Sequence, residues 1–156
     1  MRRAQAGTAQ AGFSLLEVVL VVAILAVLAA LAAPRYGRSV ARYRADAAAR
    51  RIVHDLAFAR RAARTAGASR TVTFSLPEQA YTISNVASLD GSKSYRVVLG
   101  DRPYHTELLS VDFGGDTEVK FNGYGMADSG GTVRLRVGQT IKTVVFDANR
   151  GEASVQ

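Results

Sequence analysis

Glu17 is the only charged side chain in the apolar stretch 13–33. An ionised carboxylate within a membrane helix costs roughly 2.5–3.5 kcal/mol on insertion scales, so Glu17 predicts a function and a specific partner. The preceding segment 1–12 is short and polar, carries Arg but no acid, and ends in Gly12. Cleavage after Gly12 leaves a cationic amino group on Phe13, about one helical turn from Glu17. Between two staggered copies, the carboxylate of one chain can neutralise the amine of its neighbour.

Other side chains that can carry out chemistry are isolated. The histidines have no second ligand at metal spacing, and the serines have no nearby His–Asp pair to activate them. The chain has no cysteine, which excludes a disulfide, a thiolate metal site and a thiol nucleophile. We therefore predict no catalytic residue, no metal site and no cofactor. The residues considered are His54, His105, Ser14 and Ser129.

Asp112 and Asp116 leave one alternative open. They flank Gly114 and Gly115 and offer oxygen ligands for calcium. The stretch lacks the ligand density of a calcium-binding loop, however, so we do not predict a calcium site there.

Arginine is concentrated in the segment 35–70, where ten Arg stand against Asp46 and Asp55, a balance of +8. The segment 71–156 holds eight basic and ten acidic residues, a balance of −2, so the net charge of +7 belongs to the first segment. Two interpretations remain: a solvated helix face that meets acidic groups or lipid phosphates, or a DNA-binding strip. We favour the first. The candidate phosphate contacts of the second are Arg50, Arg51, Arg60, Arg61 and Arg64.

The elements that position these residues begin with a long helix. The segment 13–34 covers about 30 Å as a helix, the thickness of a bilayer's hydrocarbon core, and it shows no polar stripe. Pro34 predicts a kink at its end. The segment 35–66 is rich in Ala and Arg and predicts an amphipathic helix that stops before Gly67. Its apolar stripe consists of Ala45, Ala49, Ile52, Leu56, Ala59 and Ala63.

After Gly67 the hydrophobic period changes to two, which predicts strands joined by turns. The sum is an α+β protein with a leader at 1–12, a transmembrane and assembly helix at 13–34, an amphipathic stem helix at 35–66, and an antiparallel β head at 71–156. The predicted strands are 71–76, 80–84, 95–99, 108–113, 118–121, 132–137, 140–146 and 152–155.

The N-terminal pattern resembles a known signature. The run Gly12-Phe13-Ser14-Leu15-Leu16-Glu17, with its apolar helix and Pro34, is similar to the prepilin-type signature of type IV pilins and type II secretion pseudopilins. The resemblance implies that a prepilin peptidase cuts between Gly12 and Phe13 and N-methylates Phe13. It also implies that Glu17 guides assembly into a helical filament and that the helix kinks at Pro34.

The head resembles the FimT/GspH family, the minor pseudopilins H of type II secretion and their relatives among minor pilins. The resemblance rests on the Ala-Arg-rich helix, the segment 121–125, the segment 130–135 and the closing hairpin. Glu152 follows Gly151 where relatives more often carry Arg, which puts DNA binding at this hairpin in doubt.

The resemblance implies a structural subunit of the type II secretion pseudopilus that takes part in protein export across the outer membrane. Its expected partners are other pseudopilins, the prepilin peptidase and the inner-membrane secretion platform, and we do not expect nucleic acid among them. Two alternatives remain: a FimT-like minor pilin that binds DNA for natural transformation, and a minor pilin that primes a type IV pilus.

We expect a single pass through the inner membrane with the head in the periplasm. The excess of Arg just after the apolar segment argues for the opposite orientation under the positive-inside rule. We follow the cleavage signature, because a leader read by a cytoplasmic-side peptidase must stay on that side.

Overall fold

The computed structural model describes residues 13–87 and 95–156, except for the side chains of 31–35. The predicted leader 1–12, with Gly12, therefore lies outside the described residues, and so does the side chain of Pro34, whose kink stays a prediction. The chain divides into two compact units, 1–37 and 38–156, which are described separately.

The helix α1 spans Leu15–Ala66 and contributes to both units. Among the residues that the structure describes, no helix combines the length and the apolar character needed to cross a membrane. The end of α1 follows from Gly67, whose φ of +57° is the left-handed conformation that glycine adopts without strain. The amides of Gly67 and Ala68 donate to the carbonyls of Arg64 and Ala63, which completes a Schellman cap.

Eight strands follow α1 among the residues that the structure describes, and their bounds agree with the predicted strands to within one residue at each end. They are β1 (Arg70–Ser75), β2 (Ala80–Ile83), β3 (Tyr95–Val98), β4 (Glu107–Asp112), β5 (Glu118–Phe121), β6 (Gly131–Val137), β7 (Thr140–Asp147) and β8 (Glu152–Val155).

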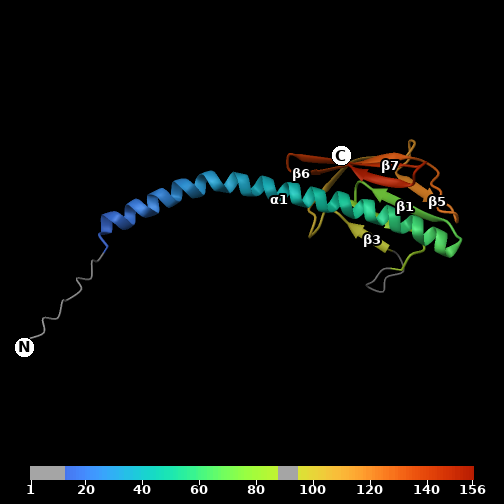
Figure 1. The fold of residues 1–156 in the computed structure, drawn as a ribbon, viewed down its shortest axis with the longest axis horizontal. Coiled ribbons are helices and arrows are strands. Elements are labelled where there is room, and N and C mark those ends of the chain that lie inside the picture. The colour runs from blue at the N-terminus through green and yellow to red at the C-terminus, as the bar shows by residue number, and fades with distance from the viewer. Residues whose placement is uncertain (1–12, 88–94) are drawn as a thin grey trace, which may run out of the picture. The chain divides into compact units, whose positions relative to one another are not determined.

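The strands form two antiparallel sheets, so the α+β class with an antiparallel head is confirmed. One sheet has the order β3-β2-β1-β5 and the other has the order β4-β6-β7-β8. In the second sheet, β6 pairs with β7 along its whole length (Figure 1). The strand β8 pairs with β7 at the edge of this sheet.

The core of the second unit lies between α1 and the two sheets (Figure 1). All six residues of the predicted helix stripe are buried, with at most 1% of each exposed. Small Ala side chains on this stripe let the strands approach the helix closely, and Phe74, Phe113, Phe121 and Phe146 fill the space above it.

Candidate functional site

The residues predicted to act in assembly stand at the start of α1. Phe13 and Ser14 precede the helix, and the amide of Val18 donates to the Ser14 carbonyl at 3.2 Å, which opens the first turn. Glu17 lies in that first turn, where its negative charge interacts favourably with the positive end of the helix dipole. Its carboxylate has no ion-pair partner among the described residues, and its side chain is exposed.

The first turns of α1 present bare apolar surface. Phe13 is 83% exposed and Leu16 is 77% exposed, and the large aliphatic side chains from Val18 to Leu28 are each half exposed or more. No described part of the chain covers them. Contiguous apolar surface of this extent marks contact with lipid or with other protein.

The five candidate arginines separate into two groups. Arg51 and Arg60 are bonded to the head, as described below. Arg50, Arg61 and Arg64 are exposed and form no hydrogen bond or ion pair with the described residues. The structure therefore does not bring the five guanidinium groups together as one surface.

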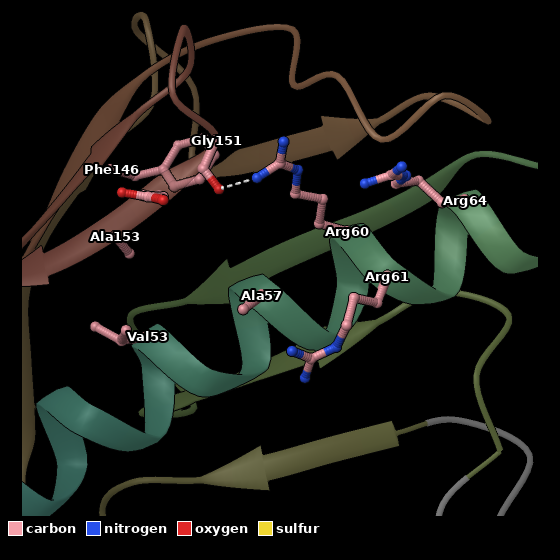
Figure 2. Close-up of a pocket in the computed structure, with 9 residues that line it drawn as sticks. Val53, Ala57, Arg60, Arg61, Arg64, Phe146, Gly151 and Ala153 are labelled. Atoms are coloured by element: carbon pink, nitrogen blue, oxygen red, sulfur yellow. Dashed lines mark hydrogen bonds between the residues drawn. The ribbon is translucent and has the colours of Figure 1, made fainter.

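Arg60 fastens the helix to two loops of the head. Its Nε donates to the Gly125 carbonyl at 3.1 Å. Its Nη1 donates to the Gly151 carbonyl at 2.8 Å, the bond that Figure 2 shows. Both glycines have positive φ, +77° and +62°. A Cβ on Gly125 would clash with the side chain of Arg64, and one on Gly151 would come within 2.5 Å of the Arg60 guanidinium carbon.

Asp55 forms a second tie between helix and head. It is 6% exposed, and it accepts hydrogen bonds from the hydroxyls of Tyr81 and Tyr95 and from Arg51 Nε at 3.0 Å. Sequence reasoning missed this site. The available signal was position, because Asp55 lies three residues after Ile52 and four before Ala59, on the buried stripe, where a carboxylate needs partners.

The proton affinities of this cluster follow from its burial. Burial raises the pKa of the Tyr81 hydroxyl above its ordinary value, and the charge and hydrogen bond of Asp55 raise it further. Burial and then Asp55 raise the pKa of Tyr95 in the same way. Burial works against the charged form of Arg51, but the hydrogen bond and charge of Asp55 outweigh it and raise the pKa of Arg51.

A groove runs between α1 and β8. It consists of two adjoining cavities of about 340 Å³ and 370 Å³, which share Val53 on the helix and Ala153 on the strand. Figure 2 shows Val53 and Ala57 on the helix, Ala153 on the strand above Val53, and the Arg60 side chain reaching from the helix to Gly151. Its charged lining consists of Arg50, Arg60, Arg61, Arg64, Lys142, Asp46 and Glu152.

The residues weighed for metal binding or catalysis do not assemble into a site. Within 13–87 and 95–156, no three His, Cys, Asp or Glu side chains are grouped to hold a metal ion. His54 and His105 are exposed on α1 and on the loop before β4. The Asp112 carboxylate accepts from the Gly115 amide at 2.8 Å, so it closes its own turn.

Comparisons with known proteins give two matches to protein families. Residues 7–33 match the prokaryotic N-terminal methylation motif. Residues 48–153, more than half of the chain, match the family described as type II transport protein GspH. We found no significant match to the chain among curated proteins or among solved structures.

Proposed function

The chain belongs to the GspH family, which makes it a pseudopilin of type II secretion, and we propose that it enters the pseudopilus through the exposed start of α1. It is a structural protein and not an enzyme. The observation that carries the proposal is the uncovered apolar surface around Glu17. In the membrane, lipid covers this surface, and in the filament, the helices of neighbouring subunits replace the lipid.

Glu17 directs this exchange. After removal of 1–12, the amino group of Phe13 carries a positive charge, and the carboxylate of Glu17 in a staggered neighbour neutralises it. In a medium of low dielectric constant, an unpaired charge is costly, so the pair favours the register in which both charges are matched. The methylation motif at 7–33 supports membrane anchoring and prepilin peptidase processing. The finer proposal is a single pass through the inner membrane with the head in the periplasm.

Glu17→Val tests the pairing. The variant removes a charge that is costly in the bilayer, so we expect normal membrane levels and an intact head. It leaves the amine of a neighbouring Phe13 without its counter-charge, so we expect several-fold lower recovery in pseudopili sheared from the cell surface. The unchanged protein serves as the reference. Equal recovery of Glu17→Val and the unchanged protein would show that the pairing does not direct assembly.

Processing is tested by mass spectrometry of the membrane-extracted protein. We expect a mature chain that begins at Phe13 and carries one N-methyl group. Gly12→Leu, which replaces the small residue at the cut, is expected to leave the full chain. An intact 1–12 segment on pilus-incorporated protein would overturn the proposal, because the Phe13 amine would then not exist.

DNA capture is the second candidate, and the exposure of Arg50, Arg61 and Arg64 favours it. We rank it below secretion because the other two candidate phosphate contacts, Arg51 and Arg60, are bonded to the head. Steep salt dependence of duplex DNA binding that disappears in the triple Arg→Gln variant of the exposed residues would favour this candidate.

A further inference from the structure

The strand β8 has a free edge with backbone groups available for pairing. It is the last strand of its sheet, and it pairs with β7 on one side only. Gln156 and Thr143 exchange both backbone hydrogen bonds, at 2.8 and 3.1 Å. Hydrogen-bonded and non-hydrogen-bonded residue pairs alternate along an antiparallel ladder. The backbone groups of Ser154 and Glu152, two and four residues before Gln156, therefore also point at β7. The amides and carbonyls of Ala153 and Val155 therefore point outward.

The space beside this edge is open. Ala153 and Val155 both line the groove along α1, and no described residue forms a hydrogen bond with their outward backbone groups. Three of the side chains that line the groove are short and apolar, Val53 and Ala57 on the helix and Ala153 on the strand (Figure 2). A further strand beside β8, at the usual spacing of about 4.8 Å, would continue the sheet over this helix flank.

Arg60 closes one end of the edge. Its guanidinium donates to the carbonyls of Gly151 and Arg150, so pairing cannot extend past the turn before β8. The available length is that of β8 itself, which is four residues. A strand of that length spans about 14 Å.

The groove is basic. Its lining carries five cationic side chains against the two carboxylates of Asp46 and Glu152. Lys142 is paired with Asp46 at 3.1 Å and Arg60 is bonded to carbonyls, which leaves Arg50, Arg61 and Arg64 on the helix rim. An acidic segment thus meets complementary charge on the helix side while its backbone meets the strand.

We propose that the free edge of β8 binds an extended acidic segment of another polypeptide by strand addition. Backbone hydrogen bonds to Ala153 and Val155 supply the pairing, apolar side chains of the segment cover Val53 and Ala57, and acidic side chains meet the rim arginines. The recognition is of an extended segment that carries both acidic and apolar residues, because the helix side of the groove presents both short apolar side chains and the rim arginines. This surface is formed by β8 and by the second half of α1, away from the segment 13–34, so it does not depend on the pairing of Glu17.

The direct test uses a fluorescein-labelled octapeptide that alternates Val and Glu, titrated against the full-length protein in detergent and followed by anisotropy. We expect saturable binding, and slower amide hydrogen exchange at Ala153 and Val155 when the peptide is present. The same peptide with N-methyl groups on alternate amides keeps its charge but cannot pair on one edge. The N-methyl groups can be placed on the odd or on the even amides, which gives two peptides. We expect one of these two peptides to bind at least about tenfold more weakly than the unmethylated peptide.

Two variants of the protein test the two halves of the proposal. Ala153→Pro removes an outward amide without touching the ladder to β7, a position where an edge strand tolerates Pro, and should weaken binding about tenfold. Arg50→Glu reverses a rim charge and should weaken binding several-fold. The matched control is Arg134→Glu, an exposed position of β6 between the buried Val133 and Leu135, which should bind as the unchanged protein does.

Several outcomes would overturn the proposal. One is a Val-Lys peptide that binds as tightly as the Val-Glu peptide, which would show that charge does not select the segment. Another is that both N-methylated peptides bind as tightly as the unmethylated one, which would show that no strand pairing takes place. A third is binding of duplex DNA in the same groove with no binding of the Val-Glu peptide. If Ala153→Pro fails to fold, Arg50→Glu and the N-methylated peptides still decide the question.

Discussion

Replacing Asp55 with Ala should destabilise the head more than any other change of a charged side chain on the second half of α1. Asp55 is 6% exposed and joins the helix to β2 and β3 through the hydroxyls of Tyr81 and Tyr95, the second at 2.9 Å. It also holds Arg51 Nε at 3.0 Å. The substitution removes the acceptor of all three groups at once.

The magnitude follows from what each partner can do afterwards. Tyr81 is 1% exposed, so its hydroxyl is left buried without an acceptor, at a cost of about 1–3 kcal/mol. The side chain of Arg51 is 41% exposed, so it can turn to water, and its ion pair with Asp55 contributes little to the loss. With the bond to Tyr95 and the lost packing of the carboxylate, we expect about 3 kcal/mol in total, or roughly 10 °C in melting temperature.

The assay is urea unfolding of the full-length protein in detergent, followed by tyrosine fluorescence, since the chain contains no tryptophan. The control is Asp46→Ala, which breaks a pair with Lys142 at 3.1 Å on the same helix. The Asp46 side chain is 43% exposed, so this change should cost less than about 1 kcal/mol. The slope of the unfolding free energy with urea should be the same for both variants if each acts on stability alone.

A double-mutant cycle with Tyr81→Phe decides whether the hydrogen bond carries the loss. If Tyr81 depends on Asp55 as the structure has it, Tyr81→Phe should cost much less in the Asp55→Ala background than in the unchanged protein, with a coupling of about 1 kcal/mol or more. Additive effects, or a loss for Asp55→Ala no larger than for Asp46→Ala, would refute the reasoning.

Two further predictions concern the same face of the helix. Arg60→Ala should cost about 2 kcal/mol, because it leaves the carbonyls of Gly125 and Gly151 without their donor, whereas Arg61→Ala should stay within about 0.5 kcal/mol. The urea midpoints of the two variants measure these losses of stability. Equal losses would show that the hydrogen bonds of Arg60 to the two carbonyls do not stabilise the head. Raising the pH above about 10 should lower stability progressively, because the raised pKa values of Tyr81 and Tyr95 mean that the folded state holds their protons after the unfolded state has lost them. Tyr81→Phe should make stability less dependent on pH in this range. A urea midpoint of the unchanged protein that does not vary from about pH 9 to 11 would contradict the predicted loss of stability.

Local signals predicted the elements well. The stripe of Ala45, Ile52 and Ala63 at helical spacing is buried as expected, and Gly67 ends α1 because a left-handed residue is needed there. The strands followed from alternation, since each buries one face. Each of these patterns is complete within a short stretch of the chain, so a sequence can reveal it.

The contacts that fix the head on the helix were not predicted. Asp55 meets Tyr81, 26 residues away, and Arg60 meets Gly151, 91 residues away. Their pairing depends on how eight strands divide into two sheets, which alternation does not specify. The only local sign of these contacts was the place of Asp55 on the apolar stripe of the helix. The role of Arg60 was missed because all arginines of the stem were grouped as one charged face.

The basic charge of the stem therefore does not form one surface. Arg51 and Arg60 face the head, and both are held by acceptors there, so their charge helps to fix the helix. The rim arginines lie on the flank beside β8, where Arg61 and Arg64 are about one turn apart and Arg50 is about 16 Å from Arg61 along the helix. A phosphate-tracking strip needs several closely spaced cations on open surface. Widely spaced cations along the free edge of a strand suit an extended acidic segment better, because its charged side chains recur at every second residue and its backbone finds partners in β8.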